Sequence, residues 1–157
     1  MKIAALVLAL AAALPAAAAD VEVRFSAPEK FRDAGRAGAD RERATAAIGD
    51  VFRTLGATLP QGQTLRVDVT DLDLAGTPKI TPRGDVRVLR DGFDWPRIDF
   101  AWALEADGRV LRQGVESLAG VADDRHAALR SDSSVLPREK RMLERWFAQR
   151  FDTARPQ

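Results

Sequence analysis

The stretch TLRVDVTDLDLAG, residues 64–76, decides the fold because it starts as a strand and changes its pattern halfway along. Apolar and polar residues alternate from Leu65 to Val69, which is the two-residue period of a strand with one buried face. Strict alternation would then place Asp71 and Asp73 on the buried face. One extra, unpaired residue restores the pattern, so we predict a β-bulge near Thr70–Asp71.

The segments before this strand predict a crossover unit. Residues 21–25 alternate as a short strand, and residues 26–40, rich in Gly, Pro and charge, predict a loop. Apolar residues then recur at three- and four-residue spacing and predict a helix from about Arg41 to Leu55, with Asp40 as its N-cap. Strand, helix and strand in this order predict a parallel pair with a right-handed connection, if both strands share one sheet.

After Gly76, the segment 77–85 contains two prolines and a glycine and predicts a loop, and residues 86–89 form a brief strand candidate. Residues 98–104 alternate as a marked strand. The dipeptide Asp107-Gly108 then predicts a tight hairpin to a partner strand over residues 109–118.

The C-terminal part of the chain predicts a loop over residues 120–135 and a final helix that begins at Pro137. This helix carries an apolar stripe that we expect to pack in the core, although its many arginines also fit a helix lying on a membrane surface. Together the elements predict a single α+β domain over residues 20–157, in the order β-α-β-(β)-β-β-α. We expect a sheet of four or five strands with both helices packed on one face.

The N-terminal segment 1–19 has the pattern of a secretory signal peptide. Lys2 precedes an apolar run of about a dozen residues, and four alanines follow Pro15, so we expect cleavage after Ala19 and a periplasmic location. The alternative, a membrane anchor, needs about 18 to 20 apolar residues. We therefore expect no stable membrane anchor after cleavage.

Composition excludes several functions. The chain has no cysteine and one histidine, His126, which excludes thiol chemistry and argues against a transition-metal site. Without residues 1–19 the numbers of basic and acidic residues are equal, so we expect no nucleic-acid partner. No glycine-rich phosphate loop follows a strand, and we expect no cofactor.

Three blocks of sequence resemble a known family. They are DLDLAG at residues 71–76, WPRI at residues 95–98, and a block that begins at Glu139-Lys140 and ends at Trp146-Phe147. In these blocks the chain resembles the proteobacterial "domain of unknown function 3016" family of small exported proteins. The resemblance implies an exported single domain and names no activity. Where the family carries an Asp and a Tyr after the last hairpin strand, this chain has Leu118-Ala119-Gly120.

The aspartates of residues 68–73 are the main candidates for chemistry. From Asp71 the spacing matches the start of a calcium loop, but Ala75 and Pro82 occupy ligand positions, so we predict no metal site. Asp71 and Asp73 can instead hydrogen-bond backbone amides at the bulge, contact a partner, or act as acid and base in a hydrolase.

Two further features of the sequence are candidate sites. Trp95 and Arg97 are residue types common at binding hot spots, while Arg97 could equally form a salt bridge with one of the two aspartates. His126 has serines and acids near it in sequence, but its charged loop favours a solvated histidine over a catalytic triad.

These observations predict a periplasmic, non-catalytic module that binds an envelope protein or a small ligand. The predicted binding residues are Asp71, Asp73, Trp95 and Arg97, and no residue is assigned a catalytic role. The alternative function is a small hydrolase that uses Asp71 or Asp73 as acid or base.

Overall fold

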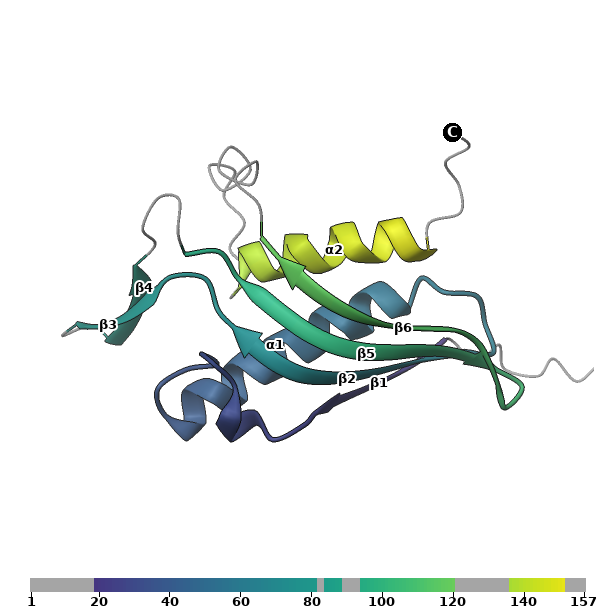
Figure 1. Ribbon diagram of the computed structural model, residues 1–157, viewed down its shortest axis with the longest axis horizontal. Coiled ribbons are helices and arrows are strands. Elements are labelled where there is room, and N and C mark those ends of the chain that lie inside the picture. Colours follow the sequence, from purple (N-terminus) through teal and green to yellow (C-terminus); the bar gives the residue numbers. More distant parts are fainter. Residues whose placement is uncertain (1–18, 82–83, 89–93, 121–135, 152–157) are drawn as a thin grey trace, which may run out of the picture.

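The computed structural model describes residues 19–81, 84–88, 94–120 and 136–151 (Figure 1). In chain order the elements are β1 Asp20–Phe25, the short 3-10 helix η1 Pro28–Lys30, α1 Gly38–Gly56, β2 Gln63–Asp73, β3 Thr77–Thr81, β4 Gly84–Val88, β5 Arg97–Ala106, β6 Arg109–Ala119 and α2 Pro137–Phe151. The chain is therefore an α+β protein, as predicted.

The main sheet has four strands in the order β1-β2-β5-β6, with β1 and β2 parallel and the other neighbours antiparallel. The parallel pair confirms the predicted crossover through α1. The turn between β5 and β6 is the predicted hairpin, in which Asp107 and Gly108 have φ angles of 51° and 71°. Positive φ at both turn residues is typical of the tight two-residue hairpins that match strand twist.

The predicted bulge is present in β2. Val69 pairs with Phe100 and Asp71 pairs with Asp99, so the register shifts by one residue between Val69 and Asp71. Thr70 is the extra residue, and its hydroxyl donates to the carbonyl of Asp99 at 3.1 Å. The shift turns Asp71 away from the core and allows Leu72 to be fully buried.

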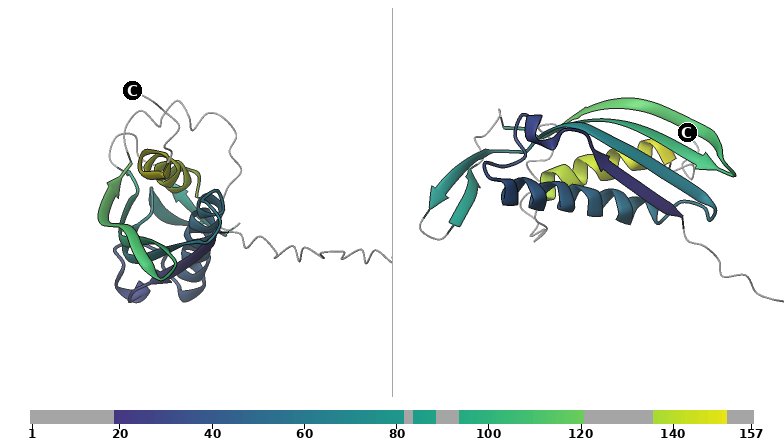
Figure 2. Two further views of the ribbon diagram at one scale, coloured as in Figure 1. Left: turned by 90° about the vertical axis from the view of Figure 1, so that its right-hand side faces the viewer. Right: turned by 90° about the horizontal axis from the view of Figure 1, so that it is seen from below.

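Both helices cover the same face of the sheet, which arches over them (Figure 2). Three aromatic rings join the layers: Phe52 of α1, Phe100 of β5 and Trp146 of α2. Their ring centroids lie 4.9–5.9 Å apart in edge-to-face arrangements, which is the geometry that aromatic pairs favour. The core therefore lies between one sheet face and the two helices, and the described elements leave the other sheet face uncovered.

Two local predictions are wrong. Residues 77–85, predicted as a loop, contain β3 and the start of β4, which form a separate two-stranded hairpin. Pro78 fits there because a two-stranded hairpin has an outer edge on each strand that needs no N–H donor. The N-cap of α1 is Ala37 instead of Asp40; Asp40 lies one turn inside and accepts the N–H of Ala37 at 3.3 Å.

Several predictions concern residues outside the described part of the chain. These are the signal peptide in residues 1–18 and the loop in residues 121–135 with His126. Among the described residues, no helix is long and apolar enough to cross a membrane.

Candidate functional site

The uncovered sheet face brings together three of the four predicted binding residues. Asp73 of β2 and Arg97 of β5 are register partners, and Asp71 pairs with Asp99 one step further along the same two strands. Because buried Ile98 and Phe100 point into the core, their neighbours Arg97 and Asp99 point to the uncovered face. The alternation of the strands therefore places these side chains at one end of that face.

Asp71 binds Arg32, which lies in the loop after β1, at the edge of this site. Its carboxylate accepts the backbone N–H of Arg32 at 2.9 Å, and it lies 3.1 Å from the guanidinium Nε of the same residue. It also accepts the N–H of Leu72 at 3.0 Å. These bonds hold Arg32 and the bulge in place, which is a structural use of the carboxylate.

Asp73 is half-buried and lies beside a second aspartate. Asp33 and Asp73 form an isolated parallel bridge. Burial raises the pKa of Asp73, and the charge of Asp33 raises it further. Arg97 is exposed, and no ion pair joins it to Asp71 or Asp73 although all three residues are described. The salt bridge that the sequence offered as an alternative for Arg97 is thus not formed.

Trp95 contacts a different element, the helix α2. The guanidinium carbon of Arg138, in the first turn of α2, lies 5.0 Å from the centre of the Trp95 ring. This is a cation–π distance. The next residue, Pro96, is buried. Trp95 therefore packs the segment just before β5 against the start of α2, on the helix side of the molecule.

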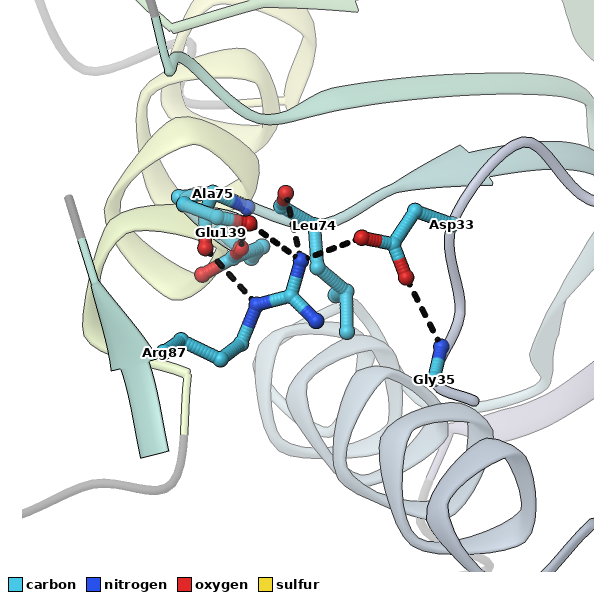
Figure 3. A network of polar contacts seen from close by, with 7 residues as sticks. Asp33, Gly35, Leu74, Ala75, Arg87 and Glu139 are labelled. Carbon is cyan, nitrogen blue, oxygen red and sulfur yellow. Dashed lines mark hydrogen bonds and ion pairs between the residues drawn. The ribbon is translucent and has the colours of Figure 1, made fainter. Parts of the chain in front are cut away.

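A polar network that the sequence analysis missed lies beside this end of the sheet (Figure 3). Arg87 of β4 donates from Nε to the carbonyl of Ala75 at 2.8 Å. Its Nη2 donates to the carbonyls of Leu74 at 3.0 Å and Gly76 at 2.6 Å, and to the carboxylate of Asp33 at 2.6 Å. One guanidinium thus fixes the β3–β4 hairpin to the end of β2 and to the loop before α1.

Glu139 completes the network from α2. Its side chain accepts the N–H of Ala75 at 2.8 Å, and the residue is only 2% exposed. Burial raises the pKa of Glu139, and the bond from Ala75 and the charge of Arg87 offset part of this effect. Residues 71–76 and the block from Glu139, two of the blocks that carry the family resemblance, are therefore in direct contact.

The centre of the uncovered face is a shallow hollow of about 950 Å³. Ala101 and Ala103 form its floor, and longer side chains of the neighbouring strands surround them. One of these, Arg66, pairs with Glu22 at 3.3 Å and with Glu105 at 3.1 Å. Val115 on β6 is 84% exposed. The hollow thus combines an apolar floor with charged walls.

The arrangement of the described residues bears on two chemistries, acid–base catalysis by the aspartates and metal binding. The raised pKa of Asp73 is a property of general acids, yet neither this hollow nor a second cavity of about 240 Å³ is lined by Asp71 or Asp73. In the part of the chain that the structure describes, no group of three His, Cys, Asp or Glu residues could hold a metal ion.

These features define a single-domain α+β protein in which two helices back one face of a four-stranded mixed sheet. The chain belongs to the family described as "Protein of unknown function (DUF3016)", whose model matches residues 19–149. No curated protein and no solved structure gives a significant match.

Proposed function

We propose that this chain is an exported, non-catalytic binding module of the cell envelope, and that its partner is a protein that docks on the uncovered sheet face. The observation that carries the proposal is the state of Arg97. Its side chain is exposed on that face and forms no ion pair in the described structure, although Asp73 lies opposite it in the neighbouring strand. An arginine in this state is available to an acidic group of a partner.

The centre of the uncovered face also suits a protein contact. Interfaces combine a small apolar centre with polar groups at the rim, and arginine is common among the residues that dominate binding. Ala101 and Ala103 supply such a centre, and Val115 adds exposed apolar surface beside it. We therefore expect the partner to place an apolar side chain over the alanines and a carboxylate against Arg97.

Export is the second part of the proposal, and it rests on the signal-peptide pattern of residues 1–19. We expect the protein recovered from the periplasm to begin at Asp20. Mass spectrometry of the intact protein measures this directly, and a protein that retains residues 1–19 in the cytoplasm would contradict it.

A small hydrolase that uses Asp73 as acid remains the second candidate function, because burial raises the pKa of this carboxyl group. The binding module is preferred for two reasons. Asp71, the other candidate acid, is held by Arg32, and neither described cavity is lined by Asp73.

The test is a pull-down from envelope extract with protein that begins at Asp20. The variant Asp73→Asn/Arg97→Ala removes the two surface charges and leaves the bonds of Asp71 intact. The matched control Asp107→Asn/Arg109→Ala makes the same charge changes at the β5–β6 turn. We expect a partner that the unmodified protein and the control retain and the surface variant loses. Equal retention by all three folded proteins would contradict the proposed surface.

A further inference from the structure

We propose that the chain also binds a small organic anion, in a cavity of about 240 Å³ formed between the start of α1, the segment before it and the β3–β4 hairpin. Three arginines from different parts of the chain line this cavity, together with apolar side chains. Its lining includes Arg36, Arg43, Arg87, Ala44 and Leu74.

Arg87 lines the cavity with a guanidinium group that other bonds hold in place. Its Nε and Nη2 are already bonded to three carbonyls and to the carboxylate of Asp33, so the guanidinium plane cannot turn freely. Its Nη1 has no acceptor within the described part of the chain and carries no dashed line in Figure 3. A guanidinium held in place by other bonds loses little conformational freedom when it binds an anion.

Of the other two arginines, Arg36 supplies the net positive charge of the cavity wall. Arg36 is exposed and has no ion pair among the described residues. Arg43 is paired with Asp40, which also lines the cavity and accepts the N–H of Ala37. The hydrogen bond from Arg43 is the main reason that the pKa of Asp40 is lowered, so this carboxylate is ionised and already satisfied. Because Arg87 is likewise paired with Asp33, the uncompensated positive charge of the wall is that of Arg36.

The apolar residues and the volume restrict the ligand. Ala44 and Leu74 are buried and form part of the wall, so the cavity offers an apolar surface beside its charges. Its volume lies just below the ~300–1,000 Å³ typical of small-molecule pockets. We therefore expect a carboxylate or phosphate group on a compact apolar body, about the size of one aromatic ring.

This proposal goes beyond the protein-binding function and does not depend on it. The cavity shares no lining residue with the hollow on the sheet face. The pull-down variant at Asp73 and Arg97 leaves the cavity wall unchanged, and the variants below leave the sheet face unchanged. Either proposal can therefore fail without the other.

The test uses benzoate and phenyl phosphate as probes, with benzyl alcohol as the neutral control of similar shape. Binding to protein that begins at Asp20 is followed by calorimetry and by the backbone amide NMR signals of Gly35 and Ala44. We expect saturable binding of at least one anion, little binding of the alcohol, and shifts of these two signals. The exposed Arg36→Gln variant should weaken binding about tenfold, because it loses one charge-assisted hydrogen bond.

The control variant Arg109→Gln makes the same change at the exposed β5–β6 turn and should bind as the unmodified protein does. The Arg87→Lys variant keeps the charge but loses the planar fork and should also bind more weakly. Should it fail to fold, Arg36→Gln still decides the question. The proposal is wrong if neither anion binds at millimolar concentration, if benzyl alcohol binds as tightly as benzoate, or if Arg36→Gln and Arg109→Gln have equal affinities.

Discussion

Glu139 holds a carboxyl group at a position that is only 2% exposed, where a charge is costly. Burial raises its pKa, so the folded protein binds this proton more tightly than the unfolded chain does. Between the ordinary carboxyl pKa and the raised one, folding takes up a proton. The free energy of unfolding should therefore fall as the pH rises through this range.

The Glu139→Gln variant tests this account. Glutamine keeps an acceptor for the N–H of Ala75 and cannot ionise, so we expect a free energy of unfolding at pH 7 that is equal to or higher than that of the unmodified protein. Its dependence on pH above the ordinary carboxyl pKa should be weaker. Urea unfolding at several pH values measures both, with the exposed Glu144→Gln as control. A Gln variant that is less stable at pH 7 and keeps the full pH dependence would contradict the account.

The Glu139→Leu variant separates the hydrogen bond from the charge. Leucine leaves the buried N–H of Ala75 without its acceptor, which costs about 1–3 kcal/mol. We expect this variant to be less stable than Glu139→Gln at every pH in the same urea experiment. Equal stability of the two variants would show that the bond to Ala75 contributes nothing.

The role of a single residue could be predicted from the sequence where it depends on the residues next to it in the chain. The bulge followed from Asp71 and Asp73, because two aspartates on a buried face are improbable. Arg87 and Glu139 gave no such signal. Their partners are backbone groups of residues 74–76, and an arginine that binds carbonyls looks in sequence like any surface arginine.

Among the elements, α1 approaches β1 closely at Gly56. A Cβ added there would overlap Cγ2 of Val21, whereas one added at Gly38, in the first turn of the same helix, would meet nothing within 4 Å. We therefore expect Gly56→Ala to lower the free energy of unfolding by about 1–3 kcal/mol through overpacking. Gly38→Ala should be neutral or slightly stabilising, because alanine favours the helix. Thermal unfolding of both variants measures this, and equal effects would contradict the packing.

The helices and strands were predicted correctly where a sequence pattern is compatible with only one kind of secondary structure. Alternation gave β2 and β5, and Asp107-Gly108 gave the hairpin between β5 and β6. The β3–β4 hairpin was not predicted because Pro78 and Gly84 are residue types that indicate a loop. Its attachment to the rest of the protein comes from Arg87 and its distant partners, which local sequence does not reveal.

For the whole molecule, the layers are joined by the contact of Phe100 with Phe52 and Trp146. Because Phe100 is fully buried, we expect Phe100→Ala to cost about 3–5 kcal/mol. Val115→Ala, on the uncovered face, removes a side chain that is 84% exposed and should change stability by no more than about 0.5 kcal/mol. Urea unfolding compares the two, and similar losses would contradict the placement of the core on one face.

The most direct test of the binding function is photocross-linking in the living cell. A photoreactive phenylalanine analogue at position 115 lies in the hollow of the sheet face, and one at position 110, near the β5–β6 turn, is the control. We expect a cross-linked protein of defined mass from position 115 that is absent from position 110. The same product should disappear when Asp73→Asn/Arg97→Ala is added. No product from position 115, or one that persists in that variant, would contradict the sheet face as the contact surface.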